Sequence, residues 1–467
     1  MNQATPKSLF ADLALLPQGW CRNVILSWDA NGDLSSVTPD SIYSPAMRRA
    51  AGPVLPGMPN LHSHAFQRAM AGLTETMGDP ADSFWSWRTL MYRFAQRLQP
   101  EHLQAIGLHL YIEMLKAGYT SVCEFHYLHH AVGGQAYANP AELSARIVSA
   151  ADEAGIGMTL LPVLYQYSGF GATAPSTQQA RFISSPEWIL DLRARMKRDF
   201  PENGSRRYGV APHSLRAVSD ASLKRLVQGL NATPGDADAP IHIHVAEQTR
   251  EVDDCLAAFG RRPVQMLFEQ QQVDARWCLV HATHMSDDEY RDVAASGAVV
   301  GLCPTTEANL GDGIIDARRL LEDGASWGVG SDSNVCVNPW AELRLLEYGQ
   351  RLQHRRRNVL ANPQAPAVAD RLLQQAIAGG AGVSGRRVAG LTVGQRADFL
   401  VLDGEDANLA GRAPAQLLSA LVFCEHNENP VRDVFVGGRQ VIAGGHHPEQ
   451  ARARAAYRDA VTGLLKD

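Results

Sequence analysis

Histidine and carboxylate residues in this sequence occur at spacings that suit a metal site. His62 and His64 end a short apolar run, and both imidazoles point the same way because side chains alternate along a strand. The stretch IHIHVAE contains two more histidines, His242 and His244, and Asp332 follows a later apolar run. Zinc accepts imidazole nitrogen and carboxylate oxygen as ligands. These residues could hold a divalent cation if the fold brings them together.

A metal site of this kind suits hydrolysis, because a bound cation lowers the pKa of water to about 7 and so provides hydroxide at neutral pH. The reaction also needs groups that move protons. Glu247 follows His244 by three residues, and His281 ends the run LVH. Spacing alone does not separate His242 from His244 as the ligand. His284 is the alternative to His281, although it should lie beyond the strand end, where a helix starts.

Apolar strand-like runs alternate with amphipathic helical segments from Val54 onward. The runs are 54–61, 120–125, 158–165, 208–211, 241–245, 277–280, 298–302 and 327–330. Continuous apolar strands indicate burial on both faces, as in a parallel sheet. Eight such β/α units predict an α/β fold with a (β/α)8 barrel, in which the active site lies at the C-terminal ends of the strands.

Polar residues recur at the ends of these runs. In chain order they are His62, His64, His213, Arg216, His244, Glu247, His281 and Asp332. Such regular placement is improbable by chance. The pattern therefore predicts that these side chains meet in one site.

Both ends of the chain differ in character from the barrel. Residues 1–55 contain short β-like runs and an Asn-Gly hairpin signal, and residues 383–467 contain strands with Gly-rich turns and a closing helix near 448–465. We expect the two ends to pair in one small β-sandwich domain beside a distorted barrel formed by residues 56–382.

The bulk composition excludes several function classes. The 467 residues are 45% apolar and 20% charged, with a formal charge of −6, which does not indicate nucleic-acid or membrane-surface binding. No window reaches the roughly 20 apolar residues of a membrane span, and the N-terminus does not read as a signal peptide. Seven scattered cysteines without a CxxC pair are typical of reduced thiols. We expect a cytoplasmic protein.

The motifs PGMPNLHSH, IHIHVAEQ, LVHATH and GVGSDSN, followed by VGQRADFLVLD and VRDVFVGGR, resemble the amidohydrolase superfamily. The resemblance covers nearly the whole chain, and the four site motifs occur in the family's order. The most similar branch is that of the mononuclear deaminases. Within it, HAFQRAMAGL, FWSWRTLMYRF, EFHYLHH and APHSLRAV resemble the formimidoylglutamate deiminases.

This resemblance implies a metal and roles for the residues around it. His62, His64, His244 and Asp332 would hold one metal per subunit, with zinc expected first and Fe²⁺ or another divalent ion as the alternative. The family's HxxE spacing selects His244 over His242. Glu247 would carry protons and His281 would orient the attacking water, with Asp332 sharing the proton.

A single metal is also favoured by the lysines. Binuclear relatives bridge two metals with a carboxylated lysine at a strand end. None of the five lysines lies at a predicted strand end: they are Lys7, Lys116, Lys197, Lys224 and Lys466.

The resemblance further implies hydrolysis of N-formimidoyl-L-glutamate to N-formyl-L-glutamate and ammonia in histidine degradation. This substrate carries two carboxylates, which arginine binds better than lysine. The family's substrate contacts match Gln67, Arg88, Tyr127, His213 and Arg216. Family tendency also suggests a homodimer.

Two other hypotheses remain. An aminohydrolase of a heterocyclic base or nucleoside, such as guanine, cytosine or an adenosine derivative, would share the metal chemistry but would need stacking and neutral donors more than paired arginines. A non-catalytic scaffold would usually have lost metal ligands, and all of them are present here.

Overall fold

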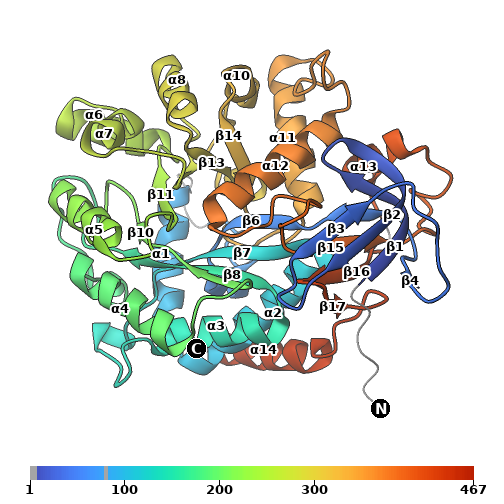
Figure 1. The fold of residues 1–467 in the computed structure, drawn as a ribbon. Coiled ribbons are helices and arrows are strands. Elements are labelled where there is room, and N and C mark those ends of the chain that lie inside the picture. The colour runs from blue at the N-terminus through green and yellow to red at the C-terminus, as the bar shows by residue number, and fades with distance from the viewer. Residues whose placement is uncertain (1–7, 78–82, 427, 467) are drawn as a thin grey trace.

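The computed structural model describes residues 8–77, 83–426 and 428–466, which form a barrel with a β domain on one side (Figure 1). The barrel consists of two parallel half-sheets. The first contains β6 (Met58–Ser63), β7 (Tyr119–His126), β8 (Gly157–Leu164), β9 (Arg206–Tyr208) and β10 (Ala211–Pro212). The second contains β11 (Ile241–Val245), β12 (Trp277–His281), β13 (Val299–Leu302) and β14 (Ser326–Val329).

Isolated parallel bridges join the two half-sheets. Val210 pairs with Ile241 and Ser214 pairs with His244 on one side, and Ser63 pairs with Asp332 on the other. The predicted distorted (β/α)8 barrel is confirmed, and all eight predicted runs contribute strands. The distortion lies at these two seams, where regular ladders give way to single bridges. The fourth run is divided into β9 and β10.

Helices surround the barrel. In chain order they are α1 (Phe84–Ala95), α2 (Pro100–Ala117), α3 (Glu142–Ala154), α4 (Pro186–Asp199), α5 (Asp220–Ala232), α6 (Thr249–Phe259), α7 (Pro263–Gln270), α8 (Asp287–Ser296), α9 (Pro304–Leu310), α10 (Ala317–Glu322), α11 (Pro339–His354) and α12 (Val368–Ser384). Local sequence sets their starts: Ser185, Ser219, Ser286 and Asn338 accept backbone N–H groups at four N-termini. None of the described helices is long and apolar enough to span a membrane.

Strands from both chain ends form one eight-stranded sheet, seen at the right of Figure 1, which confirms the predicted pairing of the termini. Its strands are β1 (Ser8–Leu16), β2 (Gly19–Trp28), β3 (Leu34–Thr38), β4 (Arg48–Arg49), β5 (Val54–Pro56), β15 (Phe399–Leu402), β16 (Val431–Val436) and β17 (Arg439–Ile442). It has its own core, in which Trp28, Phe399 and Phe435 pack together. Helix α13 (Pro414–Phe423) follows β15, and α14 (Gln450–Leu465), the expected closing helix, packs on α2.

One predicted strand was wrong in extent. The run 54–61 is not continuous: β5 pairs with β1 and β15 in the β domain, whereas β6 begins the barrel. The chain changes sheet at Gly57, whose N–H donates to the Asp398 carbonyl at 3.0 Å. A Cβ at Gly57 would lie 2.2 Å from Thr120 Oγ1, so only glycine fits this crossing.

Candidate metal centre and active site

The four predicted metal ligands converge at the C-terminal ends of β6, β11 and β14. His62 Nε2 lies 3.1 Å from both His64 Nε2 and His244 Nε2, and Asp332 Oδ1 lies 3.4 Å from His62 Nε2 and 3.2 Å from His64 Nε2. All four residues are buried. Ligands about 2.1 Å from a tetrahedral zinc would lie about 3.4 Å from one another. The donor set therefore fits one such cation.

Hydrogen bonds and burial keep the imidazoles ready to bind metal. His64 Nδ1 lies 3.0 Å from the Phe125 carbonyl and His244 Nδ1 lies 3.1 Å from the His213 carbonyl. Donation of each Nδ1–H leaves the Nε2 lone pair directed at the centre. Burial lowers the pKa of His62 to about 3 and holds that of His244 well below its usual value. Neutral imidazoles are the form that coordinates metals.

Asp332 is held against β6 by the backbone. Its N–H donates to the His62 carbonyl at 3.0 Å, and its own carbonyl accepts from the His64 N–H at 2.9 Å. Asp332 has φ 46°, and Asn334, with φ 60°, donates from Nδ2 to the carbonyls of His64 and Asp332. A Cβ at Gly330 would lie 2.9 Å from His62 N. The positive φ values of Asp332 and Asn334 are costly for non-glycine residues, and backbone strain of this kind clusters at functional sites.

The competing histidines lie outside this cluster. His242 Nε2 contacts the Val383 carbonyl at 2.9 Å, and His284 Nε2 contacts the Asp312 carbonyl at 2.7 Å. Neither belongs to the group of converging donors. The structure thus places His244 in the cluster of converging donors and His281 beside it, whereas His242 and His284 lie outside it.

Glu247 and His281 lie beside the metal-ligand cluster. His281 Nε2 is 3.8 Å from Glu247 Oε1 and 3.7 Å from Asp332 Oδ2. Burial raises the pKa of Glu247. Burial alone would lower the pKa of His281, but the carboxylates of Glu247, Glu307 and Asp332 raise it to about 10 in the protein without metal. These groups can exchange protons with a molecule bound between them.

The five predicted substrate-binding residues line one cavity together with these groups. They are Gln67, Arg88, Tyr127, His213 and Arg216. Gln67 Nε2 donates to Tyr127 Oη at 2.7 Å, and the Gln67 Oε1 atom is buried without a hydrogen-bond partner. An unsatisfied buried acceptor of this kind favours a ligand that donates a hydrogen bond.

Arg88 lies on α1, which covers the cavity. Its guanidinium donates to Tyr165 Oη at 2.9 Å, to the Ser168 carbonyl at 3.3 Å and to Tyr92 Oη. Gln179 Nε2 also donates to Tyr165 Oη, at 2.7 Å. The hydrogen bonds of Arg88 thus go to neutral oxygens, and its guanidinium also lies 5.5 Å from the centre of the Trp85 ring. Among the described residues its charge has no carboxylate partner.

Arg216 reaches the same cavity from the loop after β10. Its Nη2 lies 3.6 Å from Glu247 Oε2 and its Nε lies 3.7 Å from Glu251 Oε1. Its guanidinium also lies 5.6 Å from the centre of the Trp85 ring on α1. The two arginines thus approach one cavity beside the metal-ligand cluster.

Some functional neighbours escaped the sequence prediction. Glu251, in the first turn of α6, lies four residues after Glu247 and accepts the Glu247 N–H at 3.1 Å. The i, i+4 spacing of the two glutamates was a usable signal in the sequence. Glu307 follows β13, whose strand end was left without a site residue, and its position after a strand could have revealed it. Tyr92 and Tyr165 gave no comparable signal, because aromatic residues in apolar runs are usually core residues.

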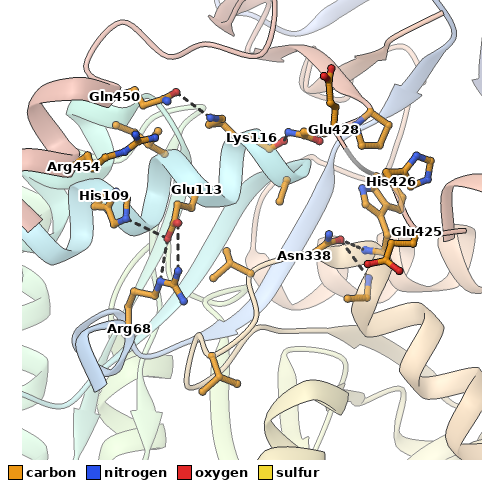
Figure 2. Close-up of a pocket in the computed structure, with 18 of the residues that line it drawn as sticks. Arg68, His109, Glu113, Lys116, Asn338, Glu425, His426, Glu428, Gln450 and Arg454 are labelled. Carbon is orange, nitrogen blue, oxygen red and sulfur yellow. Dashed lines mark hydrogen bonds and ion pairs between the residues drawn. The ribbon is translucent and has the colours of Figure 1, made fainter. Parts of the chain in front are cut away.

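A larger cavity, with a volume of about 990 Å³, lies elsewhere, among α2, α11, α13 and α14 (Figure 2). Three of its charged or ionisable groups pair with one another, since Glu113 lies 3.0 Å from Arg68 and 3.5 Å from His109, and Lys116 donates to the neutral Gln450 at 3.0 Å. In the described part of the chain, neither group of converging metal donors lines it. The smaller cavity at the strand ends is instead lined by His64, His244 and Asp332 of the converging donors.

Comparison with known proteins decides the family. The profile of the amidohydrolase family matches residues 54–441. The chain belongs to the amidohydrolase family. It is similar to the formimidoylglutamate deiminase of Pseudomonas aeruginosa, with 50% identity over 98% of this chain and 99% of that protein. The predicted resemblance is confirmed.

Solved structures agree with the fold. An amidohydrolase from Brucella melitensis has a TM-score of 0.92 and 46% identity, covering 98% of this chain and 100% of that chain. An adenosine deaminase from Xanthomonas campestris, solved with bound zinc, has a TM-score of 0.79 but only 20% identity, covering 98% of each chain. That second likeness establishes the shared fold alone.

Proposed function

We propose that this member of the amidohydrolase family hydrolyses N-formimidoyl-L-glutamate to N-formyl-L-glutamate and ammonia. The observation that carries the proposal is the presence of Arg88 and Arg216 in one cavity beside the metal-ligand cluster. A dianionic substrate requires this pairing, whereas a neutral base does not. The formimidoylglutamate deiminase of Pseudomonas aeruginosa, which is 50% identical over nearly the full length of both chains, supports the same substrate.

We assign one zinc ion per chain to His62, His64, His244 and Asp332. Three imidazoles and one carboxylate form a donor set that zinc favours, and Fe²⁺ or another divalent ion could replace it. When bound, the cation supplies hydroxide at neutral pH. The remaining chemistry is performed by the side chains of the cavity.

Glu247 accepts a proton from water at Oε1 or Oε2 as that water attacks the formimidoyl carbon. It then delivers the proton to the terminal nitrogen of the substrate. The resulting tetrahedral intermediate then expels ammonia and leaves the formyl group on the glutamate nitrogen. His281 directs Nε2 toward the same space, 3.8 Å from Glu247 Oε1, and orients the attacking water. Asp332 Oδ2, 3.7 Å from His281 Nε2, shares the proton.

The cavity holds the rest of the substrate. Arg88 and Arg216 bind the two carboxylates, and His213 and Tyr127 complete the walls. Gln67 Oε1, buried and without a partner, accepts a hydrogen bond from a substrate N–H. Because no carboxylate among the described residues pairs with Arg88, a substrate carboxylate supplies its counter-charge.

We also propose that the protein acts in histidine degradation in the cytoplasm and that it forms a homodimer. We propose that it binds a small dianionic amino-acid derivative as its substrate and that it binds neither nucleic acid nor a membrane. Light scattering of the purified protein would test the homodimer.

Ammonia release by the zinc-loaded protein tests the proposed function. N-formimidoyl-L-glutamate, guanine, cytosine and adenosine are compared at equal concentration. We expect rapid release from the formimidoyl compound alone. Turnover of a base instead would keep the metal site and refute the proposed substrate.

A further inference from the structure

Glu307 is a buried carboxylate that the proposed mechanism has not used. It lies in the first turn of α9 and is 5% exposed. Its Oε1 lies 3.2 Å from His281 Nδ1 and also accepts the Cys303 N–H at 2.9 Å. A buried carboxylate close to other carboxylates is costly unless its partners compensate for the lost hydration. His281 is the ionisable partner of Glu307.

The hydrogen bond to Glu307 determines how His281 faces the cavity. A carboxylate at Nδ1 requires that this nitrogen carry a proton, which leaves Nε2 as the nitrogen directed toward Glu247 and Asp332. His281 also has φ 67°, so its backbone is held in an uncommon conformation. Side-chain and backbone constraints together keep the proton on Nδ1 directed at Glu307 and fix the ring direction.

We propose that Glu307 is a positioning residue for His281, holding a proton on its Nδ1 and aiming Nε2 at the reacting water. This inference deepens the proposed function and rests on it. Glu307 does not line the substrate cavity, so it acts through His281 and not through the substrate.

Cys303 offers a competing interpretation, because His281, Cys303 and Glu307 together could hold a second metal ion. Burial raises the pKa of the Cys303 thiol well above its usual value. A protonated thiol is a poor metal ligand. The direct contact between Glu307 and His281 therefore favours a hydrogen-bonded pair.

A purely structural role for Glu307 is the main alternative, since its bond to the Cys303 N–H stabilises the start of α9. Glu342 is a matched control for this role. It is fully buried, and its carboxylate accepts the Thr305 N–H at 2.9 Å and the Thr305 hydroxyl at 2.6 Å, at the start of the same helix. Among the described residues, Glu342 makes no hydrogen bond to His281, and it does not line the substrate cavity.

Glu307→Leu, Glu307→Gln and Glu342→Gln, each loaded with metal, test the proposal. We expect Glu307→Leu to lower kcat about 10- to 100-fold with KM changed less than about threefold and with metal content unchanged. Glu307→Gln should recover part of kcat, because its amide oxygen can still accept the Nδ1–H. Glu342→Gln should lower the melting temperature but leave kcat within about threefold of the wild-type value.

A proton NMR spectrum provides a readout independent of turnover. The His281 Nδ1–H bound to a carboxylate should give a far-downfield resonance, assigned by its loss in His281→Asn. It should vanish in Glu307→Leu and persist in Glu342→Gln. A Glu307→Leu variant with wild-type kcat, or one that retains the resonance, would overturn the proposal.

Failure of the proposed substrate would be distinguishable. If the wild-type protein acts only on a base, the proposed function fails, but the kcat ratio on that base and the resonance still test Glu307.

Discussion

The Arg216 guanidinium lies 3.6 Å from the Glu247 carboxylate, so the group proposed to bind substrate also faces the group proposed to carry protons. Glu251 joins the pair, 3.7 Å from Arg216 Nε and bonded to the Glu247 N–H at 3.1 Å. A substrate carboxylate that binds Arg216 therefore competes with Glu247 for the Arg216 guanidinium. Substrate binding and the freeing of the proton carrier become linked.

Glu247→Gln should retain zinc but lose most turnover. The amide keeps the shape of the side chain but cannot accept and return a proton, so kcat should fall about 100- to 10,000-fold. Steady-state kinetics and metal analysis of the same sample check this. Loss of zinc together with activity would instead make Glu247 part of the metal site.

Arg216→Met should mainly weaken apparent substrate binding. Losing a charge-assisted contact to a carboxylate should lower kcat/KM by about 2–5 kcal/mol, or about 30- to 5,000-fold. Arg250→Met is the matched control. The Arg250 guanidinium lies 4.7 Å from the centre of the Trp85 ring, which Arg216 also contacts, but Arg250 does not line the cavity. Unchanged kinetics of Arg216→Met on the formimidoyl substrate would refute the carboxylate assignment.

Metal binding should stabilise the folded chain, because the four ligands converge only in the native state. Protein stripped with a chelator should melt at a lower temperature and recover when zinc is added. His244→Gln should lose this response, whereas His242→Gln, altered on the same strand, should keep it. Melting curves with and without zinc check the pair, and the opposite result would exchange the two histidines as ligands.

Acid stability should depend on Asp236, which is buried beside Arg193 and lies 2.6 Å from Lys197 Nζ. Burial would by itself raise the pKa of Asp236, but these cations hold it at about 2. The pKa of an aspartate in the unfolded chain is about 3.9. Because the folded-state pKa is lower, the stabilisation is present above about pH 4 and is lost as the pH falls toward about 2.

Asp236→Asn should therefore melt below the wild type at about pH 7, with the gap narrowing on acidification toward about pH 3. The exposed pair of Arg261 and Glu269 provides the control: Glu269→Gln should change the melting temperature little at any pH. A gap for Asp236→Asn that stayed constant with pH would contradict the account.

Local pattern predicted the barrel and its main site residues because the carboxyl ends of parallel strands gather at one face. His62 and His281 could be found from this rule, whereas the choice of His244 over His242 needed the resemblance to the family's HxxE motif. The break at Gly57 could not, because it depends on Thr120, which lies on another strand. Glu307 and Tyr165 likewise gain meaning only from contacts made across the fold.

The fate of the formimidoyl carbon tests the central claim most directly. Substrate labelled with ¹³C at that carbon is incubated with zinc-loaded protein and followed by NMR. We predict that the label appears in N-formyl-L-glutamate with one equivalent of ammonia, because Glu247 protonates the terminal nitrogen. Label in formamide, with free glutamate released, would contradict the account, as would an unchanged substrate.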